Sequence, residues 1–328
     1  MTRVRKSPYP RLSSPLLPVI VCGIAIHLVA RTPYPIARAQ SDPIDTVLIS
    51  PGASARTLSG HPLTLRVPGP ELILFPRSVF TMGSSRQEVQ LALQICQREP
   101  LGNECRAEMF ENELAAHRVV LSPFWLDRTE VTVQAYQRCV DAGVCSPPPY
   151  SRGAQRFDAL SLPVSLVSWE DARTFCHFVG KQLPTEAQWE RAARGLSARR
   201  FPWGQHIATR RANHGTWAAD NTDASDGFAE LAPVGSFPQG RTTEQVDDLA
   251  GNVAEWVSDV YGDGYTNKPV VDPTGPAHGT VRVVRGGSYT HGMPWLRGAA
   301  RMYHQASFRA PYLGFRCARR AAPSHPAP

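Results

Sequence analysis

Apolar residues recur at two different spacings along this chain, and these spacings predict where helices and strands form. Helices are expected where apolar residues return every three or four positions behind a serine or threonine that can cap the first turn. Cys176 shares one such face with Trp169 and Ala172, so it is expected to face the core. The four expected helices run from Ser85 to about Gln97, from Thr132 to before Gly143, from Ser168 to Gly180 and from Thr185 to Gly195.

The expected strands are short. Outside the helices, the apolar runs are bounded by Gly, Pro, Asn and Asp, which favour turns; the clearest are Leu72–Phe75, Val119–Leu126 and Val281–Val284. The chain has 30 prolines and 25 glycines in 328 residues, which is typical of long connecting loops. The pattern therefore predicts a loop-rich α+β domain. Because long loops are uncommon in compact domains, disulfides or bound ions are expected to hold them.

Residues 1–39 have the pattern of an export signal. Basic residues up to Arg11 precede an apolar run, Pro15–Ala30, and Ala37-Arg38-Ala39 offers a signal-peptidase site. The apolar run is shorter than the roughly 20 residues that a membrane helix needs. A cleaved signal and an exported chain, periplasmic or secreted, are therefore expected; an uncleaved anchor is the alternative.

The rest of the chain divides into three parts by composition. Residues 40–67 are rich in Ser, Pro, Gly and Thr and are expected to be a linker with one short strand at Thr46–Ile49. Residues 68–320 are long enough to bury one large core. Residues 321–328 cannot bury apolar area and are expected to form a disordered tail.

The positive charge of the chain lies mainly in the expected signal. Six of the 35 lysines and arginines, but none of the 28 acidic residues, fall in residues 1–39, so the formal net charge of +7 drops to about +1 after cleavage. No basic stripe interleaved with aromatic residues occurs elsewhere. Nucleic-acid binding is therefore not expected, nor is membrane insertion after cleavage.

Six cysteines remain after the expected cleavage, and an even number in an exported chain favours disulfides. Six cysteines allow 15 pairings, and sequence alone does not choose among them. Local spacing suggests Cys96–Cys105 and Cys139–Cys145, which leaves Cys176 and Cys317 to close a long loop. No Cys-x-x-Cys pair is present, so a zinc site is disfavoured.

A set of motifs follows in order from Phe80 to Cys317. The most specific are Leu183–Glu190, Gly251–Trp256 and Val281–Cys317, the last of which contains Arg285-Gly286-Gly287-Ser288 and ends in Gly314-Phe315-Arg316-Cys317. Together they resemble the formylglycine-generating enzyme (sulfatase-modifying factor) family. The resemblance implies that family's fold, a variant of the C-type lectin architecture. It also implies a bridge between Cys176 and Cys317, which match cysteines that are paired in some members.

The resemblance further implies two calcium sites, because eight residues match the ligand positions of the family. The first site would use the Asn213 side chain, the His214 carbonyl, the Asp226 carboxylate and the Phe228 carbonyl. The second would use Asp248, the carbonyls of Gly251 and Val253, and Glu255. Calcium prefers such mixtures of carboxylate and carbonyl oxygens. The alternative is that Asp226 and Asp248 are turn residues that bond their own backbone.

The resemblance does not extend to the copper site of the family. Enzymes of the family bind copper(I) through two cysteines that follow the Arg-Gly-Gly-Ser motif, a role that suits soft thiolates. Here Ser288 matches the serine, but His291 and Leu296 stand where the cysteines are expected. Ala254 also replaces a tryptophan that helps to form the family's oxygen pocket. Copper binding is therefore not expected.

Tyr289, His291 and Trp295 would line the vacated cleft, either as an aromatic surface for a ligand or as local packing and a solvated histidine. Four arginines are expected to hold this loop-rich region by bonding carbonyls and carboxylates: Arg285, Arg297, Arg301 and Arg316. The leading hypothesis is an exported binding or scaffold module, held by calcium and disulfides, whose partner is a peptide segment of another exported protein. The alternative is a divergent oxidase of peptidyl cysteine, or a metal-dependent maturation enzyme that uses His291.

Overall fold

The computed structural model describes residues 70–149, 155–218 and 223–321. The expected signal peptide, the linker with its strand at Thr46–Ile49 and nearly all of the expected tail lie outside the described residues. Within the described ranges, no helix is both long and apolar enough to cross a bilayer.

Four helices form where the sequence predicts them, and each begins directly after its expected cap. The side chains of Ser85, Thr132, Ser168 and Thr185 each accept a hydrogen bond from the backbone N–H three residues later. Cys176 is fully buried, as the spacing predicts. The helices are α1 (Arg86–Cys96), α2 (Val133–Asp141), α4 (Trp169–Phe178) and α5 (Glu186–Arg194).

The sequence analysis misses one short helix and six 3-10 turns, because segments of three or four residues carry too little periodicity to predict. They are α3 (Gln155–Asp158), η1 (Gly102–Glu104), η2 (Ala107–Met109), η3 (Glu111–Glu113), η4 (Thr209–Arg211), η5 (Pro238–Gly240) and η6 (Met293–Leu296).

The described strands form three small sheets. A central sheet has the order β8-β7-β5-β9, in which β5 runs antiparallel to β7 and parallel to β9. Two three-stranded sheets have the orders β1-β4-β10 and β2-β3-β6. The strands are β1 (Leu72–Phe75), β2 (Ser78–Met82), β3 (His117–Leu121), β4 (Phe124–Asp127), β5 (Ala254–Val260), β6 (Val270–Val271), β7 (Val281–Arg285), β8 (Met302–Gln305), β9 (Leu313–Phe315) and β10 (Ala318–Arg320).

The apolar run Val119–Leu126 forms two strands, β3 and β4, where the sequence analysis expects one. Ser122 and Pro123 separate them, and proline has no N–H to donate to a strand partner. As a result β3 pairs with β2, whereas β4 pairs with β1 and β10. The chain therefore passes from one small sheet to the other at Ser122–Pro123.

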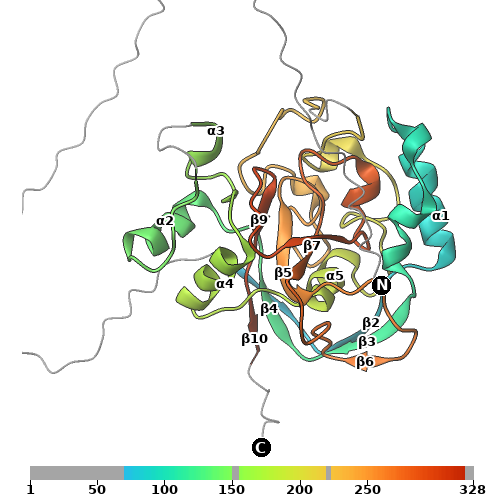
Figure 1. Ribbon diagram of the computed structural model, residues 1–328, viewed down its shortest axis with the longest axis horizontal. Helices are drawn as coiled ribbons and strands as arrows, with labels where there is room; N and C mark the ends of the chain where they lie inside the picture. Colours follow the sequence, from blue (N-terminus) through green and yellow to red (C-terminus); the bar gives the residue numbers. More distant parts are fainter. Residues whose placement is uncertain (1–69, 150–154, 219–222, 322–328) are drawn as a thin grey trace, which may run out of the picture. The chain divides into compact units, whose positions relative to one another are not determined.

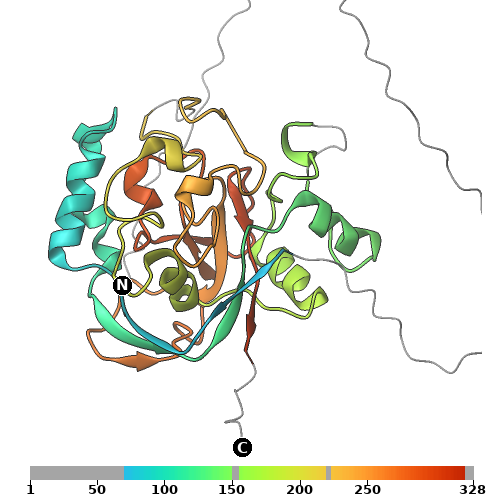
Figure 2. The same cartoon turned by 180° about the vertical axis from the view of Figure 1, so that it is seen from behind.

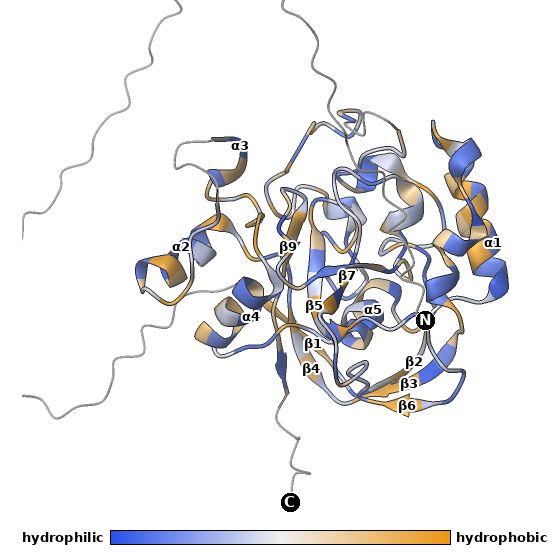
Figure 3. Ribbon diagram, in the orientation of Figure 1, coloured by the Kyte–Doolittle hydropathy of each residue, from blue (hydrophilic) through white to orange (hydrophobic). Residues whose placement is uncertain are grey.

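The helices lie on different sides of the central sheet. Helix α1 is on one side and helices α2, α3 and α4 are on the opposite side, as both views show (Figure 1, Figure 2). Helices α1, α2 and α4 each carry hydrophilic and hydrophobic residues (Figure 3), so each can bury one face. The core includes a ring cluster in which Tyr136 of α2 and Phe175 of α4 contact Phe315 of β9, with centroids 5.6–6.4 Å apart.

Three disulfides join the described cysteines. They connect Cys96 to Cys105, Cys139 to Cys145, and Cys176 to Cys317. These are the pairs that local spacing and the family resemblance suggest. The first two bridges close short loops, whereas the third links helix α4 to the segment between β9 and β10 across 141 residues.

Replacing Cys176 and Cys317 together by alanine should lower the free energy of unfolding by about 5 kcal/mol, because this bridge restricts the unfolded chain over a long loop. The matched control replaces Cys139 and Cys145 by alanine, for which the same relation gives about 2 kcal/mol. Denaturant unfolding of both variants measures the difference. Equal losses would contradict a stabilisation that depends on loop length.

Candidate functional site

The segment after β7 makes a tight turn that only glycine allows. Gly286 and Gly287 have φ values of 91° and 66°, a region that residues with a Cβ rarely adopt. A Cβ on Gly287 would lie 2.8 Å from Cδ1 of Leu296. The turn is fixed by backbone hydrogen bonds, in which Gly251 N–H donates to the Gly286 carbonyl at 3.0 Å. This geometry delivers Ser288 to a fully buried position.

Ser288 and His291 form a buried hydrogen-bonded pair. Ser288 Oγ lies 2.7 Å from His291 Nδ1 and accepts a hydrogen bond from the Thr290 N–H at 3.2 Å. Burial, and to a lesser degree His304, lowers the pKa of His291 to about 3; burial lowers that of His304 to about 4. Both imidazoles are therefore neutral at physiological pH. The contact has the geometry of a hydroxyl beside a base, but an imidazole with a pKa of about 3 is a weak proton acceptor.

The three residues expected to line a cleft are buried in the described part of the chain. Tyr289 and Trp295 are each 5% exposed and His291 is 9% exposed. Tyr289 packs in a different apolar cluster from Trp295. The Trp295 ring lies 4.8 Å from that of Trp217 and 5.9 Å from that of Phe110. Local packing therefore describes Tyr289 and Trp295, and the aromatic surface is not exposed. The expectation of a solvated histidine is wrong for His291, because the ring is buried among the residues packed around Ser288.

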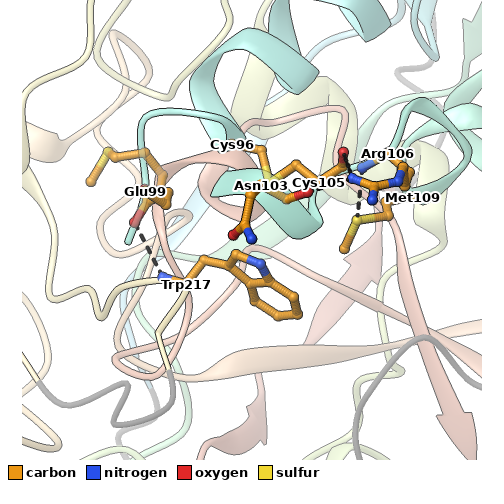
Figure 4. The surroundings of a disulfide bond; sticks show 8 residues. Cys96, Glu99, Asn103, Cys105, Arg106, Met109 and Trp217 are labelled. Carbon is orange, nitrogen blue, oxygen red and sulfur yellow. Dashed lines mark hydrogen bonds between the residues drawn. A yellow bond between two sulfur atoms is a disulfide. The ribbon is translucent and has the colours of Figure 1, made fainter. Parts of the chain in front are cut away.

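Glu99 holds the segment after α1 against this loop. Its carboxylate accepts hydrogen bonds from the N–H groups of Trp217 and Met293, each at 3.1 Å. Figure 4 shows Glu99 and the Cys96–Cys105 disulfide on the same side of the Trp217 indole. A Cβ on Gly292 would lie 2.7 Å from the carboxyl carbon of Glu99, so glycine leaves the space that the carboxylate fills. The sequence analysis misses Glu99, because its partners are backbone groups that are distant in the sequence.

Four buried guanidinium groups hold the loops around the site, which confirms the role expected of these arginines. Each pairs with a carboxylate that is also buried, and each donates to backbone carbonyls as well. Arg316, for example, donates to both oxygens of Glu255 at 2.8 Å and to the carbonyl of Asp247 at 2.9 Å. The pairs are Arg285–Glu190, Arg297–Glu113, Arg301–Glu186 and Arg316–Glu255.

The four residues expected at the first calcium site lie together. The Asp226 carboxylate accepts hydrogen bonds from the N–H groups of His214 (2.7 Å) and Phe228 (2.9 Å). The amide of the buried Asn213 donates to the carbonyl of Glu230, whereas its Oδ1 has no hydrogen-bond partner. Burial raises the pKa of Asp226. The unpartnered Asn213 oxygen is compatible with a hard cation. The bond from Phe228 is, however, the geometry of the alternative, in which Asp226 is a turn residue that bonds its own backbone.

At the second expected calcium site, the carboxylate of Glu255 is already bonded to other side chains. Both oxygens of Glu255 bond to Arg316, and one also accepts from the Trp189 indole N–H at 2.9 Å. A cation there would have to share this carboxylate with a guanidinium, so the Glu255 side chain does not fit the ligand role well. Asp248 has no guanidinium of a described residue bonded to it; it accepts a hydrogen bond from the backbone N–H of Gly235 at 2.5 Å, and its carboxyl lies within hydrogen-bonding reach of Glu130.

The sequence analysis misses one acidic residue near the second expected calcium site, Glu130. It is fully buried, and its Oε1 accepts a hydrogen bond from Asn252 at 3.1 Å, whereas its Oε2 has no partner. Burial and the nearby Asp248 carboxylate raise the pKa of Glu130 well above its ordinary value. The local sequence gives no signal of this burial, because Arg128, Thr129 and Thr132 around Glu130 are polar. A cation between Glu130 and Asp248 would offset this unfavourable burial.

No free cysteine thiolate is available in the described residues. Each of the six described cysteines is bonded to another cysteine. No group of three or more His, Cys, Asp or Glu side chains in the described ranges is arranged to hold a metal ion. The two calcium sets are compatible with this finding, because they draw on amide and carbonyl oxygens as well as carboxylates.

The family model for the sulfatase-modifying factor enzyme 1-like domain matches residues 63–321. The chain belongs to the sulfatase-modifying factor family. A formylglycine-generating enzyme from Streptomyces coelicolor is 43% identical over 167 residues, which cover 48% of this chain and 52% of that protein. An inactive Cα-formylglycine-generating enzyme 2 from Mus musculus is 36% identical over 177 residues, covering 52% and 53%. The chain thus spans about half the length of these sulfatase-modifying factor relatives, which include active and inactive proteins.

The fold of this sulfatase-modifying factor domain is also found in solved structures. The structure of PvdO from Pseudomonas aeruginosa aligns with a TM-score of 0.61 and 26% identity, covering 77% of this chain and 95% of that protein. The mixture of few helices and short strands is therefore that of formylglycine-generating-enzyme-like proteins.

A double-mutant cycle tests whether Glu99 fills the space at Gly292. Gly292→Ala should lower the free energy of unfolding by about 1–3 kcal/mol, because the new methyl group collides with the carboxylate. Gly292 has an ordinary negative φ, so backbone strain does not contribute. In a Glu99→Ala background, the same substitution should lower the free energy of unfolding by less than about 0.5 kcal/mol. Additive costs in urea unfolding would show that the two residues do not interact.

Proposed function

We propose that this protein is an exported binding or scaffold module of the sulfatase-modifying factor family that does not carry out the copper-dependent oxidation of peptidyl cysteine. The partner proposed is a peptide segment of another exported protein. The observation that supports this most strongly is the state of the cysteines. All six in the described domain are in disulfides, and the remaining one, Cys22, lies in the expected signal.

The residues at the family's copper position support the same proposal. Leu296 is fully buried and has no metal-binding atom. His291 offers one imidazole, and its Nδ1 is already bonded to Ser288. Copper(I) in this family requires two thiolates, so the residues present do not fit that ion. No reaction step that depends on copper is proposed for this chain.

Calcium is the ion proposed for the two sets of oxygen ligands. The first site would be held by the Asn213 side chain, the Asp226 carboxylate and the carbonyls of His214 and Phe228. The second would be held by Asp248, Glu130 and the carbonyls of Gly251 and Val253. Calcium bound at these places would supply charge that neutralises buried carboxylates and would tie loops together. Its proposed role is structural.

Export is proposed from the disulfides and the N-terminal sequence. Disulfides persist in oxidising compartments and are rare in the cytosol, so three of them fit an exported protein. The basic and apolar pattern of residues 1–39 supports the same destination. The periplasm and the medium are both compatible with it.

A second candidate function is enzymatic, and one observation favours it. The 2.7 Å contact between Ser288 Oγ and His291 Nδ1, with His291 neutral, is the geometry of a hydroxyl beside a general base. A divergent oxidase of peptidyl cysteine or a metal-dependent maturation enzyme could use this pair. Its burial and the closed cleft make this candidate the weaker one.

Purified protein, incubated with copper(I) and a sulfatase-type cysteine peptide, should leave the peptide thiol unchanged. Mass spectrometry detects conversion of cysteine to the aldehyde, and the Streptomyces coelicolor enzyme serves as the positive control. Aldehyde formation by the wild type would overturn the proposed function. Its loss in His291→Ala would then support the enzymatic candidate.

Calcium at about 100 times its dissociation constant should stabilise the wild type by about 2.7 kcal/mol per site relative to chelator. Thermal unfolding with and without chelator measures this. In Glu130→Gln the calcium gain should fall by roughly half. The variant in chelator should be about as stable as the wild type, because the raised pKa of Glu130 keeps its carboxyl neutral without calcium and glutamine is neutral as well. The control is Glu108→Gln, a change at an exposed residue. No chelator effect on the wild type would refute the calcium proposal.

A further inference from the structure

A cavity lies where the chain passes from one small sheet to the other. Its volume is about 360 Å³, which falls within the range of roughly 300–1,000 Å³ that is usual for small-ligand sites. The turn between β3 and β4, the first turn of α5 and the end of β10 all contribute to its walls. The polar part of the lining includes Ser122, Gln182, Thr185, Gln188, Asp272 and Arg320.

The alternation of side chains along β10 places Arg320 on the side of the sheet that holds the cavity. Ala318, two residues earlier, is fully buried and packs in the same apolar cluster as Ala187 of α5. Successive side chains of a strand point to opposite faces, so Arg320 lies on the α5 side. Arg319 lies on the other face, where its guanidinium is over the Trp125 ring. Unlike the four buried arginines, Arg320 is exposed and makes no hydrogen bond or ion pair with a described residue.

The backbone of Arg320 forms an open strand edge beside the cavity. Toward β4, the N–H of Ala321 donates to the Pro123 carbonyl at 3.2 Å. Away from β4, Ala318 exchanges two backbone hydrogen bonds with Gln182, at 2.7 and 2.8 Å. Neighbouring residues of a strand direct their backbone groups to opposite edges, so Arg320 faces the same edge as Ala318. No described residue bonds to the Arg320 backbone there, and β10 is the last strand of its sheet on that side.

The first turn of α5 adds a second uncommitted donor. Gln188 is 8% exposed, and its Oε1 accepts a hydrogen bond from the Thr185 N–H at 2.9 Å as part of the capping box. Its Nε2 donates to no described residue and still reaches solvent. Because Gln188 lines the cavity, this amide donor is available to a bound group. The dipole of α5 adds positive potential at the same end of the helix.

Asp272 is the one carboxylate among the described residues that line this cavity. Its oxygens accept hydrogen bonds from the N–H (2.8 Å) and the hydroxyl (2.7 Å) of Ser122. These bonds tie the turn between β3 and β4 to the residue that follows β6. A carboxylate oxygen can accept more than one hydrogen bond, so Asp272 can still accept one from an amide N–H. The cavity therefore offers donors for a carboxylate, an acceptor for an amide and an open strand edge.

We propose that this cavity binds the C-terminal carboxylate of a peptide. The Arg320 guanidinium and Gln188 Nε2 donate to the carboxylate, and the last residues of the peptide extend the edge of β10 through the Arg320 backbone. Leu121, Pro123 and Ala321 provide apolar contact for a small final side chain. A free amino acid or a small carboxylate would leave the strand edge unused, which favours a peptide. The inference rests on the proposed function and deepens it, because it names the part of the partner peptide that is bound.

Fluorescence anisotropy of the purified protein tests this site. The probes are tripeptides that end in alanine or valine and carry fluorescein at the N-terminus. Probes with a free C-terminal carboxylate should bind about tenfold more tightly than the same probes with a C-terminal amide, because the amide loses the charge-assisted hydrogen bonds. Arg320→Gln should weaken binding of the free acids by about tenfold for the same reason. The matched control Arg319→Gln removes the neighbouring guanidinium on the opposite face and should bind like the wild type.

Gln188→Glu gives a second readout, because glutamate keeps the capping-box acceptor for the Thr185 N–H but replaces the Nε2 donor with a charged oxygen. Binding of the free acids should fall by at least about tenfold, while the thermal unfolding midpoint stays close to that of the wild type.

Three results would overturn the proposal: no binding of the free acids, equal affinity for acid and amide, or equal affinity of the wild type and Arg320→Gln. Displacement of the probe by free valine as effectively as by the unlabelled peptide would also overturn it, because the strand edge would then play no part. Each of these results removes this site alone. The proposed function is overturned separately, by aldehyde formation in the assay with copper and the cysteine peptide.

Discussion

The structure depends on buried arginines that must find acceptors. A guanidinium has five N–H donors, and each one left unpaired inside a protein is costly. Arg316 is fully buried and meets this demand with a carboxylate and with backbone carbonyls from irregular segments. Arg285, also fully buried, does so through its two Nη atoms, whereas its Nε has no partner among the described residues. Segments without regular hydrogen bonding are thereby fixed to the helices and strands. This explains how a domain with three small sheets holds such long loops in one conformation.

The same network borders the tightly packed segment that follows the glycine turn. Leu296 is buried beside Gly287, Trp295 packs on Trp217 and Phe110, and Glu99 bonds the backbone of Trp217 and Met293. Burial of the apolar side chains stabilises this packed form of the segment. The Ser288–His291 pair lies within the packed region. The binding role proposed for the domain would therefore use other, exposed surfaces.

The buried carboxylates divide into two groups with different consequences. Glu186 and Glu190 have guanidinium partners, and they act as fixed parts of the frame. Glu130 and Asp259 are buried without such partners, and their pKa values are raised for that reason. A carboxylate of the second kind needs either a cation or a proton. The calcium proposed at Glu130, where Asp248 adds a second carboxylate, would meet this need.

Local chemistry in the sequence determined the four capped helices, because a cap and its apolar face lie within a few residues of each other. It also determined the family motifs and the arginines that hold the site, since buried charge of this kind must be paired. It could not determine that Ser122–Pro123 divides one apolar run between two sheets, or that Glu99 and Glu130 matter. Those outcomes were decided by the tertiary structure, because the partner of each buried carboxylate is supplied by segments far away in the chain.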